Sequence, residues 1–495
     1  MKSRLRRRRL VGAAALGLAC VAAFDAVGAQ QQPKYSYPVV RDQRGVIPPG
    51  PRVPPYNSPP LGDGPFPFET YEQRNIRVAV VTKGLSHPWS LAFLPGGDML
   101  ITERVGRLRL VRNGLLQPDP VAGTPKVVSL ATMAGLMDIA LHPRFAENKW
   151  IYISYHKPAG TGIGVDGRES PLASNAIMRG TWDGNALTEV RDIFVADDVD
   201  MEASRIAFAQ DGLLYMTIGG PGTGPSASLD RPQHGNDYAG KVLRMRDDGS
   251  LPPDNPFVAK PGYKPYVYSL GHRNLLGLAI NPYNGDVWTG EQGPNGGDEI
   301  NIIRPGRNYG WPLVSDGRDY RGHYLSPTPY KEGMERPHVV WVPSIALSGI
   351  AFYTGDRFPN WKRNLFVGGM REGEIARTGQ LVRIVFNDNW DELRRESLLR
   401  DLHQRIRDVR QGPDGFLYLV VDGDNQAGLG RATATALGAA GINIQFLVTL
   451  VTGKKYRSIF GFGAGADVEQ AKKVIRSAAA AMRPKRPARR PARKK

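Results

Sequence analysis

One short segment recurs six times along this chain of 495 residues and constrains its fold more than any other feature. Each copy starts at an aliphatic residue and continues through a turn into an apolar-aromatic strand, and five of the six copies begin with an apolar, a small and a second apolar residue. In five copies the small residue is an alanine: Ala92, Ala140, Ala207, Ala279 and Ala351. Successive alanines lie 48, 67, 72 and 72 residues apart, and a sixth copy starts at Val409.

Six copies of a small β unit favour radial repetition, because each four-stranded sheet has to pack its faces against its neighbours. The composition between residues 76 and 424 agrees, since short runs of Val, Ile, Leu, Tyr and Trp alternate with Gly, Asp, Asn and Pro turns. The sequence therefore predicts an all-β fold, a six-bladed β-propeller, over residues 71–425. A sandwich of independent β-hairpins is the alternative, because the copies differ in length.

The net charge of +18 suggests at first a nucleic-acid partner, but its distribution along the chain argues against one. Six basic residues lie within residues 1–24 and eight within residues 483–495, and neither tail contains an acidic residue. Only +4 is left for residues 25–482. We therefore expect no nucleic-acid binding. The basic tail at 483–495 is either a contact with an anionic surface or a solvated end.

Residues 1–29 have the three parts of a secretory signal peptide: a cationic stretch, an apolar run from Leu10 to Phe24, and small residues leading to Ala29. We therefore expect a periplasmic or secreted protein. The arginines before Leu10 also fit twin-arginine export, and Cys20 is an alternative site for lipoprotein anchoring. Cleavage near Ala29 would remove the one cysteine of the sequence, which excludes disulfides and thiolate metal ligands.

Two further segments flank the predicted propeller. Residues 30–70 form a proline-rich leader that adds little to a core. In residues 426–482 we expect a small α/β extension, with helices at 428–440 and 467–482 and strands at 442–451 and 456–463. The order of these elements resembles part of an ACT-type ligand-binding domain that lacks its first strand.

Three stretches have the polarity expected of loops at one end of a propeller channel. His142 follows an apolar strand, and its imidazole suits proton transfer near neutral pH; a hydrogen-bonded structural histidine is the alternative. Residues 291–301 combine amides, carboxylates and turn residues whose oxygens suit a hard cation such as calcium, or form only a turn. Arg405 and Arg407 alternate along a strand, so both face one ligand with several carboxylates or both are solvated.

At these residues the chain resembles the glucose/sorbosone dehydrogenase family. The shared motifs run in the family's order and are the His142 segment, residues 240–256, GHRN at 271–274, EQGPNGGDEIN at 291–301, NYGWP at 308–312 and RIRD at 405–408. Within the family, the chain is most similar to soluble aldose sugar dehydrogenases that use pyrroloquinoline quinone (PQQ). The resemblance implies a six-bladed propeller and oxidation of the C1 hydroxyl of a sugar to the lactone.

The resemblance also implies a role for individual residues. His142 would be the general base, and Arg273 would favour the negative charge that develops on the quinone. The main-chain carbonyls of Gly293 and Pro294 would bind the Ca²⁺ ion that polarises the quinone, and Trp341 would contact the substrate. The residues implied to bind PQQ are Arg273, Asn274, Gln292, Asp298, Arg371, Arg405 and Arg407, with Arg371 standing where the family usually has a lysine.

We therefore expect an exported, PQQ- and calcium-dependent dehydrogenase that passes electrons from an aldose such as glucose to an external quinone, cytochrome or dye. One alternative is a calcium-dependent propeller hydrolase of the lactonase kind, which has no need for arginines that hold a tricarboxylic quinone. The other is a propeller that serves as a binding module, which would tolerate loss of His142 and of the arginines.

Overall fold

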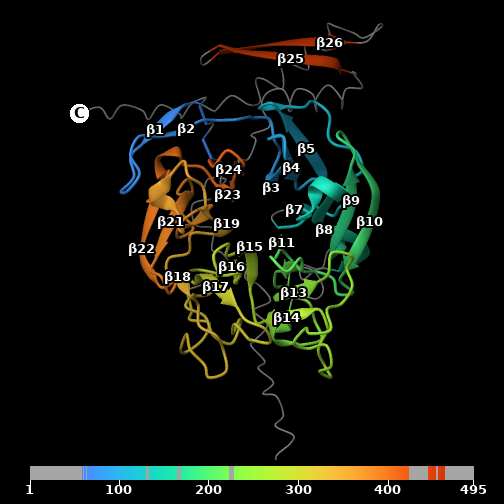
Figure 1. Ribbon diagram of the computed structural model, residues 1–495, viewed down its shortest axis with the longest axis vertical. Coiled ribbons are helices and arrows are strands. Elements are labelled where there is room, and N and C mark those ends of the chain that lie inside the picture. Colours follow the sequence, from blue (N-terminus) through green and yellow to red (C-terminus); the bar gives the residue numbers. More distant parts are fainter. Residues whose placement is uncertain are drawn as a thin grey trace, which may run out of the picture. The chain divides into compact units, whose positions relative to one another are not determined.

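The computed structural model describes residues 58–59, 61–62, 64–129, 133–163, 169–221, 228–320, 322–422, 444–452 and 455–462 (Figure 1). The chain divides into two units, residues 1–46 and 47–495, and all described residues belong to the second. The predicted signal peptide, most of the leader and the two helices expected near the C-terminus lie outside the described residues. No helix in the described part of the chain has both the length and the apolar character to cross a membrane.

Five antiparallel sheets of four strands each follow one another along the chain, and within each sheet every strand pairs with the next. Blade 1 consists of β3 (Pro88–Phe93), β4 (Met99–Glu103), β5 (Arg107–Arg112) and β6 (Leu115–Leu116). Blade 2 consists of β7 (Leu136–Leu141), β8 (Trp150–Ile163), β9 (Glu169–Trp182) and β10 (Leu187–Val195). Blade 3 consists of β11 (Ile206–Phe208), β12 (Leu214–Ile218), β13 (Lys241–Met245) and β14 (Val267–Leu270).

Blades 4 and 5 have the same design. Blade 4 consists of β15 (Asn274–Ile280), β16 (Val287–Gln292), β17 (Asp298–Ile303) and β18 (Val339–Trp341). Blade 5 consists of β19 (Leu347–Phe352), β20 (Leu365–Gly369), β21 (Gln380–Phe386) and β22 (Glu392–Leu398). A two-stranded sheet of β23 (Ile406–Gln411) and β24 (Leu417–Val421) follows, and β1 (Phe66–Phe68) pairs with β2 (Ile76–Val78) in another.

The prediction of six complete blades was wrong, because the described residues form five. The six repeated segments are present, and each supplies the first two strands of a sheet. The last copy stops there: β24 has no further strand beside it in the described part of the chain. The strands expected near the C-terminus are found as β25 (Ile444–Thr452) and β26 (Lys455–Phe462), but they pair with each other.

The first strands of the six sheets form a closed ring. β3 contacts β7, and contacts continue through β11, β15, β19 and β23 back to β3. The two-stranded sheet thus fills the gap between blades 5 and 1, while the outer strands of the blades radiate from the ring (Figure 1). Because successive inner strands run in the same sense around such a ring, their starting residues meet at one end of it.

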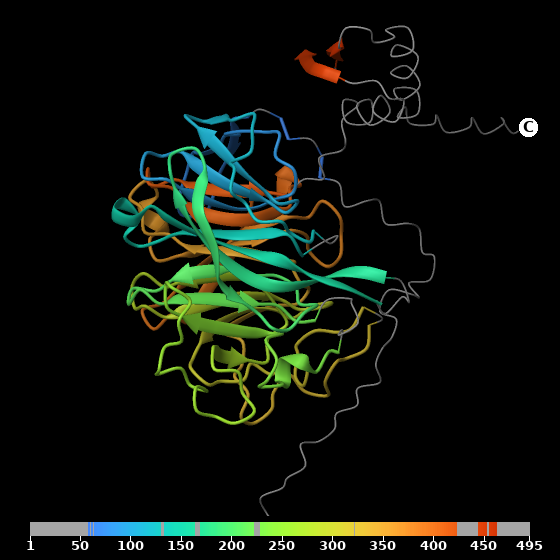
Figure 2. The same cartoon turned by 90° about the vertical axis from the view of Figure 1, so that its right-hand side faces the viewer.

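Apolar side chains fill the spaces between neighbouring blades. Between blades 2 and 3, for example, Tyr152 and Ile177 pack with Met216 and Leu243, and all four are fully buried. Burial on both faces of a blade explains why the inner strands are almost continuously apolar. The hairpin of β8 and β9 is longer than its neighbours, and Figure 2 shows it extending beyond the other strands. Since β8 runs antiparallel to β7, the hairpin projects past the starting end of the inner strands.

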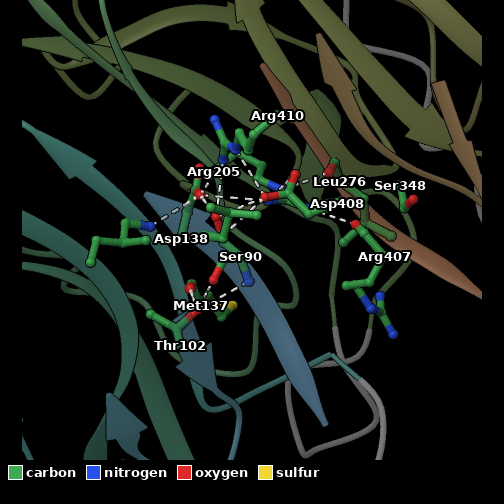
Figure 3. A network of polar contacts seen from close by, with 12 residues as sticks. Ser90, Thr102, Met137, Asp138, Arg205, Leu276, Ser348, Arg407, Asp408 and Arg410 are labelled. Atoms are coloured by element: carbon green, nitrogen blue, oxygen red, sulfur yellow. Dashed lines mark hydrogen bonds and ion pairs between the residues drawn. The ribbon is translucent and has the colours of Figure 1, made fainter. Parts of the chain in front are cut away.

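A charged network occupies the centre of the ring (Figure 3). Arg205 and Arg410 pair with Asp138 and Asp408, and Arg205 and both aspartates are fully buried. Ser90 donates to both aspartates, at 2.6 and 2.9 Å. Burial alone would raise the pKa of Asp138, but the two arginines outweigh it and lower that pKa. The network therefore ties together strands that belong to different blades.

Candidate functional site

Polar and charged side chains gather where the inner strands begin. Asn274, the first residue of β15, donates its Nδ2 to a carboxylate oxygen of Glu202 at 3.2 Å. Glu202 precedes β11, so this contact joins the starts of two neighbouring inner strands. Across the sheet, Asn274 faces Gln292, whose Nε2 donates to the Leu347 carbonyl at the start of β19. The beginnings of three inner strands thus meet at one polar site.

Arg405 and Arg407 lie at the start of β23, at the same end of the ring as Asn274 and Glu202. Both guanidiniums reach one carboxylate, that of Asp422, at 3.9 and 2.7 Å, so the prediction that the two arginines converge is confirmed. Arg407 is 3% exposed, and its guanidinium lies 4.6 Å from the Trp89 ring centroid at the start of β3. Burial alone would raise the pKa of Asp422, but Arg407 and the groups around it hold that pKa well below its usual range.

Two donor groups of Arg407 have no hydrogen-bond partner. Nη2 donates to Asp422, whereas Nε and Nη1 are buried and unsatisfied. Buried guanidinium N–H groups without acceptors cost free energy, so a ligand that supplies acceptors would be bound favourably there. Arg405 reaches Met370, and the next residue, Arg371, pairs with Glu374 at 2.5 Å. The three predicted arginines therefore lie in one region of the molecule.

Arg273 lies beside Asn274 and is anchored to the chain that follows β16. Its Nη1 donates to the carbonyls of Gln292 and Gly293, at 2.7 and 2.9 Å. Its guanidinium also lies 5.3 Å from the ring of Trp311 in the predicted NYGWP motif. The structure therefore brings the 271–274, 291–301 and 308–312 motifs together.

The calcium site expected at the main-chain carbonyls of Gly293 and Pro294 stays a prediction. A β-carbon added to Gly293 would lie 2.3 Å from the carbonyl oxygens of Gly296 and Gly297, so main-chain oxygens do crowd there. The Gly293 carbonyl, however, already accepts from the cationic Arg273. The described residues contain no cluster of three or more His, Cys, Asp or Glu side chains suited to a metal, but the ligands predicted here are main-chain carbonyls and do not depend on such a cluster. We derive no chemistry through calcium.

Asp298 is fully buried and accepts hydrogen bonds from the backbone of two segments next to the site. One carboxylate oxygen accepts from Gly293 N, and the other accepts from Ile345 N and Leu347 N, each at 2.9 Å. Burial raises the pKa of Asp298 to about 6, although these backbone donors favour the charged form. Asp298 therefore joins two loops, and its expected contact with the cofactor stays a prediction.

Trp341, expected to contact substrate, lies in the core. It is 6% exposed and packs in the apolar cluster between blades 4 and 5. The Arg395 guanidinium lies 4.7 Å from the centroid of its ring. Its place in β18 opposite Asp298 explains the burial, since that side of the strand faces blade 5. The structure does not bring Trp341 to the polar site.

His142 is also not at this site. It follows Leu141, the last residue of β7, whereas the site forms at the strand starts; six residues of β-strand span roughly 20 Å. Its ring packs against Trp150 and Phe208, and its Nε2 lies 3.3 Å from an Asp247 oxygen. Burial lowers the pKa of His142 more than Asp247 raises it. The geometry favours the alternative of a hydrogen-bonded structural histidine.

The residues that sequence reasoning missed are Glu202, Asp422 and Trp89. Each adjoins an inner strand or the end of β24, and each contacts a predicted site residue. A signal was present: Glu202 stands four residues before the repeated Ile206–Phe208 segment, as Asn274 stands four before Leu278–Ile280. Comparing equivalent positions across the repeats would have identified it.

The fold and site define a propeller with a cluster of arginines and amides at the starts of its inner strands, suited to a small anionic ligand. Residues 85–431 match the family model described as Glucose / Sorbosone dehydrogenase, and the chain belongs to this family.

Particular relatives agree with that assignment. The chain is 37% identical to aldose sugar dehydrogenase YliI of Escherichia coli (strain K12) over 358 residues, which covers 70% of this chain and 90% of the relative. It is 34% identical to quinoprotein glucose dehydrogenase B of Acinetobacter calcoaceticus over 280 residues, covering 52% of this chain and 57% of that protein. A solved PQQ-bound aldose sugar dehydrogenase from Streptomyces coelicolor is 28% identical, with a TM-score of 0.54, covering 77% of this chain and 95% of that chain.

Proposed function

We propose that this protein binds PQQ at the starts of its inner strands and oxidises the C1 hydroxyl of an aldose such as glucose to the lactone. Electrons then pass to an external acceptor, which is a quinone, a cytochrome or a dye. The names of the relatives support this chemistry, and the observation that carries it is the buried Arg407 with its two unsatisfied donor groups.

The donor set fits a ligand with several carboxylates. Arg407 offers Nε and Nη1, and Arg405 reaches the same position with a partly exposed guanidinium. Both arginines reach the single carboxylate of Asp422, so two positive charges lie together at this position. Guanidinium forks match carboxylates better than ammonium groups do, which favours Arg371 as a third donor.

Arg273 and Asn274 would face the reacting end of the cofactor. When bound, PQQ supplies the two-electron acceptor for the sugar. Arg273 is held by the carbonyls of Gln292 and Gly293, so its positive charge is fixed before a ligand arrives. The buried Oδ1 of Asn274 has no hydrogen-bond partner, which leaves it able to accept from a ligand.

The test is titration of the purified protein with PQQ, followed by glucose-dependent reduction of a dye. We expect Arg407→Met to weaken PQQ binding by about 10- to 100-fold, because a hydrogen bond to a charged group is worth about 1.5–3 kcal/mol. Arg405→Met should weaken it too, without leaving Asp422 unpaired. Arg304→Met, at a partly exposed ion pair just past the end of β17, is the matched control and should leave PQQ affinity unchanged.

The outcomes separate the candidate functions. Equal PQQ affinity in the wild type, Arg405→Met and Arg407→Met would contradict the proposed site. PQQ binding without turnover of any aldose would favour a binding module. A calcium requirement stays a prediction: if it holds, chelation of the protein lowers PQQ affinity and added Ca²⁺ restores it.

A further inference from the structure

The site must contain a group that takes a proton, and this inference rests on the proposed function. Removing a hydride from a carbon that bears a hydroxyl also requires an acceptor for the hydroxyl proton. His142 lies at the other end of β7 and cannot supply it. We propose that Glu202 is the general base of this site.

The position of Glu202 carries the proposal. Its carboxylate accepts from Asn274 Nδ2 at 3.2 Å, and Asn274 is the residue implied to contact the quinone. Its side chain is half-buried, between the buried Met201 and Ala203, so it reaches the site without being fully removed from solvent. A base needs both properties, because it must approach the substrate and later return its proton to water.

The backbone of Glu202 is hydrogen-bonded to the two residues that follow β12, the second strand of its own blade. Its N–H donates to the Gly220 carbonyl at 3.1 Å, and its carbonyl accepts from Gly219 N at 2.7 Å. Gly220 N in turn donates to the Arg273 carbonyl. Gly219 leaves no room for a side chain, since a β-carbon there would lie 2.5 Å from the Glu202 carbonyl oxygen and 2.6 Å from Asn274 Oδ1. The main chain at Glu202 is therefore held by its own blade, and Gly220 links it to Arg273, just before β15 of the next blade.

Three histidines, His87, His156 and His272, do not offer a better base. His156 and His272 are fully buried, and both ring nitrogens of each are engaged. His87 lies at the same end of the ring, but its Nδ1 is 3.4 Å from Asp422, on the side where Arg407 would hold the cofactor carboxylates. Glu202 instead accepts a hydrogen bond from Asn274, which would contact the quinone, and is linked to Arg273 through the backbone of Gly220.

The proposed step balances as follows. A carboxylate oxygen of Glu202 takes the proton as the O–H bond breaks and the C=O bond of the lactone forms. The C–H bond breaks, and its hydrogen leaves with the electron pair to the quinone, which the proposed function names as the oxidant. Arg273 favours the negative charge that this transfer creates. The protonated Glu202 then releases its proton to solvent.

The experiment compares Glu202→Gln with the wild type, both loaded with PQQ. We expect the variant to lose about 10²- to 10⁴-fold in kcat, the usual worth of a positioned general base. The dissociation constant of PQQ and the KM for glucose should change less than about threefold, since Gln keeps the size and an acceptor for Asn274. Glu147→Gln, on an exposed helix residue, is the matched control and should match the wild type.

Two further readouts distinguish a base from a structural carboxylate. Formate should partly restore turnover to Glu202→Ala, because it replaces the missing carboxylate. Infrared difference spectra on adding glucose, without an external acceptor, should show a protonated carboxyl band in the wild type that Glu202→Gln lacks.

Full activity of Glu202→Gln in a wild type that is itself active would overturn this inference and leave the proposed function intact. Loss of activity in His87→Gln, with Glu202→Gln active, would assign the base to the imidazole instead. Absence of PQQ binding by the wild type would overturn the proposed function.

Discussion

Replacing Arg205 with methionine tests whether the network at the centre of the ring stabilises the propeller. Arg205 Nη1 lies 3.0 Å from an Asp408 oxygen and 3.4 Å from an Asp138 oxygen. Its other donors reach two main-chain carbonyls, those of Leu276 at 2.7 Å and Arg407 at 3.0 Å. The substitution keeps a side chain of similar volume but removes one positive charge from a site with no access to solvent.

The magnitude follows from the charges. In the wild type, Arg205 and Arg410 balance Asp138 and Asp408, and the network is neutral. In Arg205→Met two buried carboxylates share one arginine, which leaves an uncompensated buried charge. Removing one partner of such a buried network costs about 3–5 kcal/mol. The orphaned carbonyls act in the same direction, so we expect a loss of about 4 kcal/mol.

The assay is equilibrium unfolding in urea at pH 7, followed by tryptophan fluorescence. Arg74→Met is the matched control, because Arg74 makes an ion pair with Glu69 at 3.9 Å in which both side chains are mostly exposed, 71% and 59%. Surface pairs of this kind contribute at most about 1 kcal/mol, so the control should unfold close to the wild type.

The pH dependence of the difference in unfolding free energy between Arg205→Met and the wild type is a second test. Without Arg205, the folded-state pKa of the aspartate pair rises, because one negative charge has lost its partner. Protonation on lowering the pH from 7 to 4 then relieves the buried charge in the variant but not in the wild type, so the stability gap narrows. A loss below about 1 kcal/mol at pH 7, or a gap that widens in acid, would refute the reasoning.

Three further substitutions test single features. His142→Ala should keep wild-type PQQ affinity in a fluorescence titration, because His142 lies at the opposite end of β7; a tenfold loss would contradict this placement. Burial raises the pKa of Asp298 to about 6, so the free energy of unfolding of the wild type should fall by up to about 3 kcal/mol relative to that of Asp298→Asn as the pH rises from 4 to 7. Urea unfolding measures this, and a difference that stays constant with pH would contradict the prediction. Gly135→Ala should lower the thermal midpoint, because its β-carbon would lie 1.9 Å from the Arg104 carbonyl oxygen at a φ of 133°, whereas Gly96→Ala, with open space, should not.

The repeated segments were predictable because their signals are local. An apolar alternation and a turn specify a hairpin wherever they occur, and all six hairpins are present, from β3–β4 to β23–β24. The number of complete blades was not predictable in this way, since outer strands depend on partners distant in sequence. After Asp422 the chain continues with β25 and β26, whose alternation was recognised, but nothing local showed that they would pair with each other.

The arginines of the site were predictable because a charged side chain in an apolar strand is costly to bury without a partner. Arg407 lies in β23, where four successive residues are buried, and such a position favours a buried ligand or ion pair. The partner, Asp422, lies 15 residues along the chain and reaches Arg407 only through the pairing of β23 with β24. The positive charge of Arg407 can be predicted from the sequence, whereas the carboxylate that pairs with it can be identified only from the fold.

The error over His142 has a geometric cause that applies to every repeat of this fold. Inner strands all start at one end of the ring, so residues before the repeated segment face the site and residues after it face away. His142 comes one residue after Leu141 ends β7, whereas Glu202, Asn274 and Arg407 precede the repeated segments of their own blades. In such a chain, a polar residue lies at the site only if it precedes the repeated segment of its blade. Glu202 meets this condition and His142 does not, whatever the proton-transfer chemistry of the two side chains.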